Sequence, residues 1–174
     1  LVKLMLELGC DANHRNIHGR TALHDAARFG NIEGVRILAD AGAEMDCRDE
    51  RGQAPLIEAI VNNYPETAME LVRRGADIHG PISGQQETPL MLAASRGATA
   101  LVRLLLDRGS EIESRDFIGC TPLMHASRGG SSEAVRLLLE AGADRNARDK
   151  KGLNALQWAS ALHPEVSALL LGKR

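Results

Sequence analysis

The stretch TPLMHASRGGSSEAVRLLLEAGAD, residues 121–144, decides the fold, because the chain repeats its plan before and after it. The leucine in the third position of this stretch recurs at nearly constant steps of 33, 34, 33 and 33 residues. The five leucines in register are Leu23, Leu56, Leu90, Leu123 and Leu156. A period of this length is typical of an array of stacked supersecondary units.

Each unit carries the start and stop signals of two short helices. Thr121 is a favourable N-cap residue, and Pro122 suits a first helical turn because its missing N–H would have no helical partner there. Gly130 tolerates the positive φ of a turn between helices, and Gly142 is placed to end the second helix. About ten small, polar and charged residues follow, too few for another helix. The sequence therefore predicts helix, turn, helix and a β-hairpin-like finger in each unit.

The chain resembles the ankyrin repeat family, whose T-P-L-H-x-A opening is legible at five places. These are TALHDAA at 21–27, APLIEAI at 54–60, TPLMLAA at 88–94, TPLMHAS at 121–127 and NALQWAS at 154–160. The resemblance covers essentially the whole chain. It implies a mainly α fold, an ankyrin-repeat solenoid of helix-turn-helix units joined by β-hairpin-like fingers. It also implies that His24 is a structural residue that hydrogen-bonds within and between repeats.

We expect residues 1–174 to form a single ankyrin-repeat domain. Its parts are a partial repeat at 1–15, repeats at 16–48, 49–81, 82–115 and 116–148, and a C-terminal repeat at 149–174 whose irregular turn suits a capping unit. Residues 1–9 match the second helix at 101–109, so we interpret the chain as an excerpt of a longer array or a trimmed domain. The finger from His79 to Glu87 is one residue longer than the others, either as a tolerated surface insertion or as a specificity element.

Composition narrows the class of protein further. With two phenylalanines, one tyrosine and one tryptophan, leucine and alanine must form the core. The three cysteines are odd in number and widely spaced, which favours a reducing compartment and predicts a cytoplasmic or nuclear protein. No apolar run approaches eighteen residues, so we expect no membrane insertion. The net charge of −2 excludes no class of partner.

Motifs for catalysis or cofactor binding are missing from the sequence. It has no phosphate-binding glycine motif, no nucleophile elbow and no CxxC pair for zinc. The nearest metal-like group is Cys10, His14 and His18, which lack helical spacing and an orienting carboxylate and are interpreted as solvated loop residues. We therefore expect no enzymatic activity, no cofactor, no metal and no small-molecule substrate.

The expected activity is binding of a protein partner. By resemblance, ankyrin arrays bind on a concave surface made by the finger tips and the exposed side of the first helices. The expected partner-binding residues are Ile17, Arg20, Arg28, Phe29, Arg48, Arg51, Arg96, Arg115, Phe117, Ile118, Arg128, Arg148 and Lys150. Phe117 and Ile118 together could form an apolar anchor, although single exposed apolar residues are also ordinary.

Arginines recur at one position of successive fingers, as Arg15, Arg48, Arg115 and Arg148. One interpretation is a structural ladder, in which an arginine on one finger pairs with the aspartate on the next. The other is an electropositive groove that steers an acidic segment of a protein. The scarcity of aromatic residues disfavours nucleic acid. The sequence thus predicts a non-catalytic protein–protein interaction module; the alternative is an architectural spacer or scaffold within a longer multidomain chain.

Overall fold

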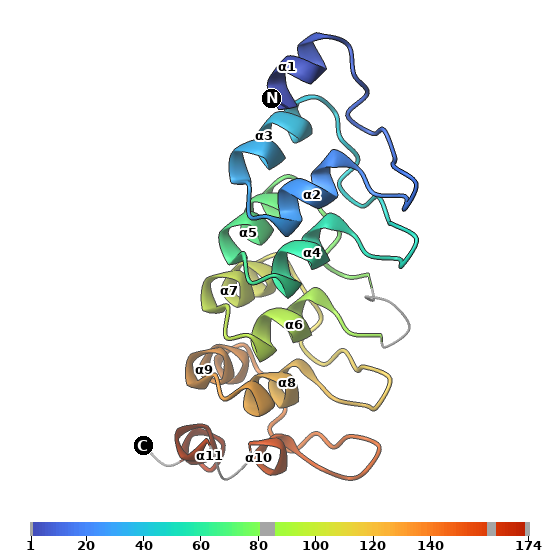
Figure 1. Ribbon diagram of the computed structural model, residues 1–174. Coiled ribbons are helices and arrows are strands. Elements are labelled where there is room, and N and C mark those ends of the chain that lie inside the picture. Colours follow the sequence, from blue (N-terminus) through green and yellow to red (C-terminus); the bar gives the residue numbers. More distant parts are fainter. Residues whose placement is uncertain (1, 81–85, 160–162, 173–174) are drawn as a thin grey trace. The chain divides into compact units, whose positions relative to one another are not determined.

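The computed structural model describes residues 2–80, 86–159 and 163–172. From α2 onward, its helices form pairs joined by short turns (Figure 1). The helices are α1 (Val2–Glu7), α2 (Ala22–Arg28), α3 (Ile32–Asp40), α4 (Pro55–Val61), α5 (Pro65–Arg73), α6 (Pro89–Ser95), α7 (Thr99–Asp107), α8 (Pro122–Gly129), α9 (Ser132–Glu140), α10 (Ala155–Trp158) and α11 (Pro164–Leu170). The predicted mainly α fold of helix-turn-helix units is confirmed. None of the helices in the described part is long and apolar enough to cross a membrane.

The first helix of each pair begins at the residue that the sequence predicts. The hydroxyl of Thr121 accepts a hydrogen bond from the N–H of Met124 at 3.4 Å, and Pro122 follows at the first helical position. Gly130 adopts a φ of +72° between α8 and α9. Gly142, with a φ of +97°, lies two residues beyond the end of α9. These local signals fix where each helix begins and ends.

The chain divides into two compact units, residues 1–77 (unit 1) and residues 78–174 (unit 2). In unit 1 the first helices α2 and α4 pack together, and the second helices α1, α3 and α5 pack in sequence. Leu23 on α2 and Leu56 on α4 are fully buried. Ala59 is also fully buried, and such small residues let helix pairs approach closely.

Unit 2 follows the same plan with one more helix pair. Its first helices α6, α8 and α10 pack in a row, and its second helices α7, α9 and α11 pack in another. Leu90 and Leu123 are fully buried, as are the small residues Ala93 and Ala126. Leucine and alanine therefore form the core, as the composition predicts.

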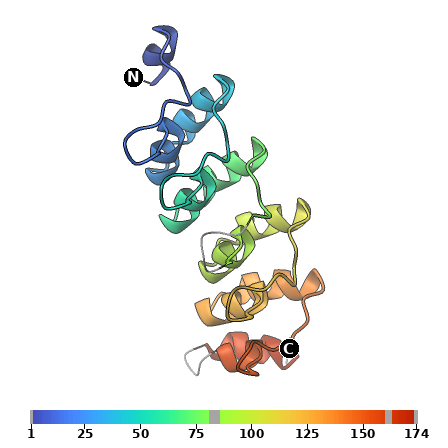
Figure 2. The ribbon, with the colours of Figure 1, turned by 90° about the vertical axis from the view of Figure 1, so that its right-hand side faces the viewer.

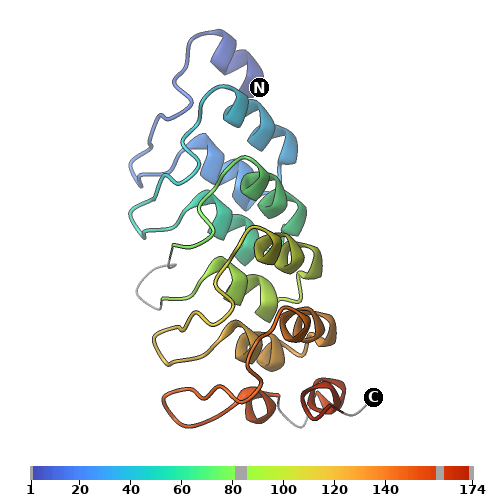
Figure 3. The same ribbon diagram turned by 180° about the vertical axis from the view of Figure 1, so that it is seen from behind.

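Within each unit the fingers leave the helix pairs on the same side (Figures 2 and 3). The finger before α8 is closed at its tip by a backbone hydrogen bond of 3.1 Å from Asp116 N to Cys120 O. The tip of one finger also contacts the next, since Lys150 N donates to Ile118 O at 3.0 Å. The lengthened part of the finger between His79 and Glu87 includes residues 81–85, and the irregular turn of the last repeat includes residues 160–162. Both of these predictions fall outside the described residues.

Candidate functional site

Each described finger folds around one side chain near its start. The Oδ1 atom of Asp116 accepts the N–H groups of Ile118 at 3.0 Å and Cys120 at 2.8 Å. The Oδ1 atom of Asp149 accepts in the same way from Lys151 and Leu153. Asp49 and Asn16 occupy this position in unit 1 and make the equivalent bonds within their own fingers. A short acidic or amide side chain that bonds to the backbone two residues on is a standard turn device.

The second carboxylate oxygen of these aspartates binds a donor nine residues later, on the first helix of the same repeat. Asp116 Oδ2 lies 2.9 Å from His125 Nε2, and Asp149 Oδ2 accepts from Trp158 Nε1 at 3.0 Å. Both aspartates are buried. Burial by itself raises the pKa of Asp149, but the bonds from Leu153, Lys151 and Trp158 outweigh it and lower that pKa below its usual value. These carboxylates are therefore internal parts of the fingers.

In the second finger of unit 1 the residue nine positions after Asp49 is Glu58, which cannot donate. Arg20 of the preceding finger takes the donor's place. Its Nη1 atom lies 2.6 Å from Glu58 Oε1 and 3.5 Å from Asp49 Oδ2, and its Nη2 atom lies 3.2 Å from Asp25 Oδ1. The side chain of Arg20 is only 12% exposed. Arg20, one of the expected partner-binding residues, is thus turned inward.

Of the two interpretations of the finger arginines, the structural ladder holds only in part, because the arginines bond to carbonyls and not to aspartates of the next finger. Arg115 Nη1 donates to Arg148 O at 2.7 Å and to Gly119 O at 3.0 Å, and Arg15 donates to Arg48 O at 2.6 Å. Arg48 and Arg148 donate to glycine carbonyls in their own fingers. Among the described residues, no ion pair joins one of these four arginines to a finger aspartate. Both oxygens of Asp116 and of Asp149 already bind N–H groups within their own repeats, and Asp49 Oδ2 lies 3.5 Å from Arg20 Nη1 of the preceding finger.

The structure leaves several of the expected apolar contacts open to solvent. Ile17 is 86% exposed, Phe29 70% and Phe117 59%. Ile118 is half-buried beside Phe117, so the proposed two-residue anchor is mainly Phe117. Lys150 Nζ lies 5.7 Å from the Phe117 ring centre, and the guanidinium of Arg28 lies 5.8 Å from that of Phe29. These distances are within the range of a cation–π contact.

The remaining expected cations stand on the same fingers and first helices. Arg28 and Arg128 lie at the C-terminal ends of α2 and α8, and Arg96 follows α6. Arg51 and Lys150 lie at finger tips, and all five side chains are exposed. Apart from Arg20, the structure therefore brings the predicted residues of each unit to one kind of surface, the fingers and first-helix ends, here called the finger surface.

Reasoning from the sequence missed His125 and Trp158. His125 is buried, and Trp158 lies under Arg128, whose guanidinium is 5.6 Å from the indole ring centre. Arg128 Nη2 also approaches His125 Nδ1 at 3.5 Å. Both residues could have been identified from the sequence, because each is a side-chain donor nine residues after a finger aspartate.

His24 has the structural role that the family resemblance implies. Its Nδ1 atom accepts from the Thr21 N–H at 3.1 Å, so Nε2 carries the proton and donates to Gln53 O in the next repeat at 3.0 Å. Burial lowers the pKa of His24, and the nearby charge of Arg20 lowers it further. His24 thus ties two repeats of unit 1 together as a neutral side chain.

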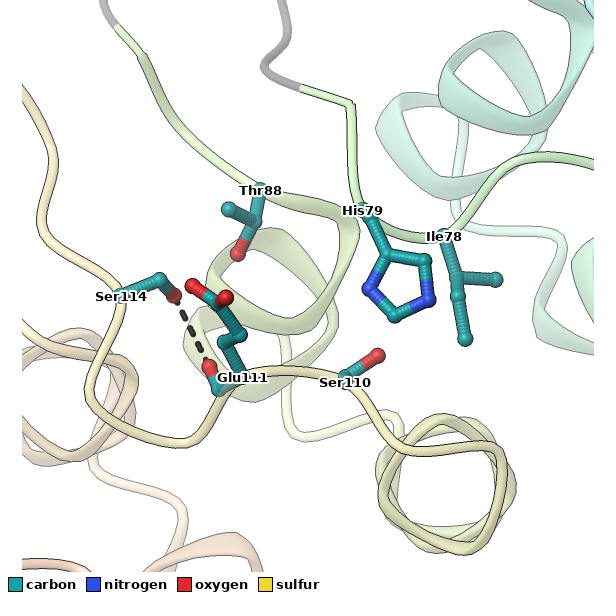
Figure 4. Close-up of a pocket in the computed structure, with 6 residues that line it drawn as sticks. All are labelled: Ile78, His79, Thr88, Ser110, Glu111 and Ser114. Carbon is teal, nitrogen blue, oxygen red and sulfur yellow. Dashed lines mark hydrogen bonds between the residues drawn. The ribbon is translucent and has the colours of Figure 1, made fainter.

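Three cavities among the described residues are small. One of about 90 Å³ in unit 2 is lined by Ile78, His79, Thr88, Ser110, Glu111 and Ser114 (Figure 4). In it Ser114 Oγ donates to Glu111 O at 3.0 Å, and the buried Ser110 Oγ has no hydrogen-bond partner among the described residues. Two others, of about 170 Å³ at the unit 1 finger tips and about 190 Å³ beside α11, are also below the size of typical small-molecule sites, roughly 300–1,000 Å³.

Within each unit, short helices in pairs with fingers on one side define a helical repeat protein. The family model described as ankyrin repeats (3 copies) matches residues 1–81, 42–116 and 90–174, and the chain belongs to the ankyrin repeat family. Proteins of this family are generally protein–protein interaction modules and generally non-enzymatic.

Similar proteins include ankyrin repeat protein nuc-2 of Neurospora crassa, 34% identical over 62% of this chain and 10% of that protein. Another is the human ankyrin repeat and KH domain-containing protein 1, 40% identical over 58% of this chain and 4% of that protein. The chain thus spans a tenth or less of these relatives. Among solved structures, a chain in the complex of the Bdellovibrio bacteriovorus predatory endopeptidase Bd0816 with immunity protein Bd3460 is similar, with a TM-score of 0.86 and 27% identity over 98% of this chain and 90% of that one.

Proposed function

We propose that this chain is a non-catalytic interaction module that binds a protein partner through its finger surface. The observation that carries the proposal is the exposure of Phe29 and Phe117 on that surface, where the fold does not need them for its core. Exposed aromatic side chains with neighbouring cations are typical anchors of protein interfaces. The solved complex that contains a similar chain joins two proteins, which supports the same mode of action.

Cations beside these aromatic side chains support an acidic partner. Arg28 stands next to Phe29, and Lys150 stands over Phe117. Such charges accelerate encounter with an acidic segment and orient it, even where each exposed pair contributes only about 0–1 kcal/mol. Free thiols at Cys10, Cys47 and Cys120 support a reducing compartment, the cytoplasm or nucleus.

The experiment is affinity capture from a cell extract with quantitative comparison of the bound proteins. One variant carries Phe29→Ser and Phe117→Ser on the finger surface. The control carries Arg103→Ser and Glu140→Ser, two exposed positions on the second helices α7 and α9. Each variant is first checked for an unchanged thermal unfolding transition.

We expect the finger variant to lose partners that the parent and the second-helix control retain. If only the second-helix control lost partners, the proposal that partners bind the finger surface would be refuted. If the folded parent captured no specific partner at any salt concentration, an architectural spacer would be the better function.

A further inference from the structure

The two units differ in the charge of their finger surfaces. In unit 1, the matched segments 15–28 and 48–61 contain five arginines and four carboxylates, a net charge of +1. In unit 2, segments 115–128 and 148–161 contain five cations and two carboxylates, a net charge of +3. The third matched segment of unit 2, 82–95, contains Glu87 and no cation. The excess of positive charge thus lies on the last two repeats of unit 2.

The positions of the carboxylates increase this difference. The two in unit 2, Asp116 and Asp149, are buried and bonded to His125 and Trp158 within their own repeats. In unit 1, Asp25 and Glu50 are exposed on the surface itself. Asp25 contacts Arg20, and Glu50 lies 3.7 Å from His18 Nδ1. An incoming acidic group would therefore meet exposed carboxylates on unit 1 and none in the described part of segments 115–128 and 148–161 of unit 2.

The cations of unit 2 are also held in place. Lys150 Nζ donates to Phe117 O at 2.7 Å while lying over the Phe117 ring. Arg128 is held between the Trp158 ring and His125 Nδ1. Arg115 and Arg148 bind carbonyls through Nη1, and within the described residues their other guanidinium N–H groups carry no hydrogen bond. Side chains ordered in advance lose less conformational entropy on binding.

We propose that an acidic segment of the protein partner binds on unit 2, along the fingers and first-helix ends of its last two repeats. The residues that would bind it, here called the cationic face, are Arg115, Phe117, Arg128, Arg148, Lys150 and Trp158. This inference rests on the proposed function and adds the unit, the residues and the chemistry of the ligand. Glutamate or aspartate side chains pair with the guanidinium and ammonium groups, and an apolar side chain of the segment packs on the exposed part of Phe117.

A nucleic acid is the competing polyanion. Its single strands bind by stacking bases on open aromatic faces. The two aromatic rings of the cationic face, Phe117 and Trp158, each already have a cation over the ring. The arrangement favours carboxylates with a small apolar contact over stacked bases.

Two pairs of equivalent positions give matched variants. Lys150 and Glu50 occupy the same place, since the N–H of each donates to the preceding finger, to Ile118 O at 3.0 Å and to His18 O at 3.1 Å. Arg128 and Arg28 both lie in the last turn of a first helix and both contact an aromatic ring. A change in unit 2 can thus be compared with the same kind of change in unit 1.

The probe is a short fluorescein-labelled peptide of glutamates around one phenylalanine, titrated with the whole chain and followed by anisotropy. Fluorescence of Trp158, the single tryptophan, reports independently because its ring lies in the cationic face. We expect binding that weakens between about 50 mM and about 300 mM salt and a change in Trp158 emission. Lys150→Glu and Arg128→Gln should each weaken binding, the charge reversal by about tenfold, whereas Arg28→Gln should change it less than about twofold.

Equal losses from Arg28→Gln and Arg128→Gln, or an unchanged affinity of folded Lys150→Glu, would overturn the assignment to unit 2. Binding of a peptide with glutamine at every glutamate, or of a single-stranded oligothymidylate as tight as the acidic peptide, would overturn the ligand chemistry. The proposed function is tested by the separate affinity-capture experiment, and it is refuted if the Phe29→Ser/Phe117→Ser variant retains every captured protein. A chain that captures partners through these phenylalanines and ignores the acidic peptide would keep the proposed function and refute this inference.

Discussion

Arg20 Nη1 lies 2.6 Å from Glu58 Oε1, although the two residues are 38 positions apart in the chain. The contact exists because Glu58 occupies the position where unit 2 has the donors His125 and Trp158. Arg20 supplies the missing donor from the neighbouring finger and also approaches Asp49. An arginine that the repeat pattern places among the binding residues is therefore a structural link between two repeats.

Replacing this arginine should destabilise unit 1. Arg20→Leu leaves Glu58 and Asp49 poorly compensated, and we expect a loss of about 2–3 kcal/mol in the free energy of unfolding. Urea unfolding followed by far-ultraviolet circular dichroism measures it. Arg28→Leu, an exposed matched control, should cost less than about 0.5 kcal/mol. The double variant Arg20→Leu/Glu58→Leu should recover part of the loss, and equal stability of the two single variants would refute the structural role.

The fold could be predicted from the sequence because its signals are local. Thr121 and Pro122 mark a helix start, Gly142 marks an end, and the leucine period sets the stacking. The candidate surface was predicted only in outline. Whether a cation is available to a partner depends on contacts between neighbouring repeats, as Arg20 and Arg115 show. A repeat pattern does not state whether a side chain bonds to a carboxylate or to a carbonyl. The role of Trp158 could not be predicted, because it depends on where its indole N–H lies relative to Asp149.

The neutral state of His24 predicts a pH dependence of stability. Burial holds the pKa of His24 in the folded chain below its usual value of 6.5. As pH falls below about 6.5 the unfolded chain binds a proton that the folded chain excludes, so stability falls until the folded pKa is reached. Urea midpoints at about pH 7.5 and about pH 5 should differ more for the parent than for His24→Gln. An identical pH dependence of the two proteins would contradict a buried neutral imidazole.

Gly129 should be required for the packing of α8 on α6. A Cβ atom built there would collide with the carbonyl of Ser95, which belongs to α6. In an ordinary exposed helix Gly→Ala stabilises by up to about 1 kcal/mol. Gly129→Ala should instead destabilise unit 2 by about 1–3 kcal/mol, because the two helices must separate. Trp158 fluorescence during urea unfolding measures the change, and a stabilised variant would show that the helices are not this close.

The thiol of Cys120 should be unreactive in the folded protein. Burial, and after it the neighbouring carboxylates of Asp116 and Asp149, raise its pKa to about 12. The thiolate is the reactive form, so alkylation near neutral pH should be slow. In a Cys10→Ser/Cys47→Ser variant only Cys120 remains, and we expect modification only on addition of denaturant. Complete native labelling within minutes would contradict the buried site.

Photo-crosslinking tests the binding surface most directly. A benzoylphenylalanine is placed at Phe117 on the finger surface or at Arg103 on the second helix α7, each in the whole folded chain. The chains are irradiated in the extract from which partners were captured. We expect the residue at 117 to crosslink a specific protein and the residue at 103 to give none. A partner crosslinked at 103 and absent at 117 would contradict binding through the finger surface.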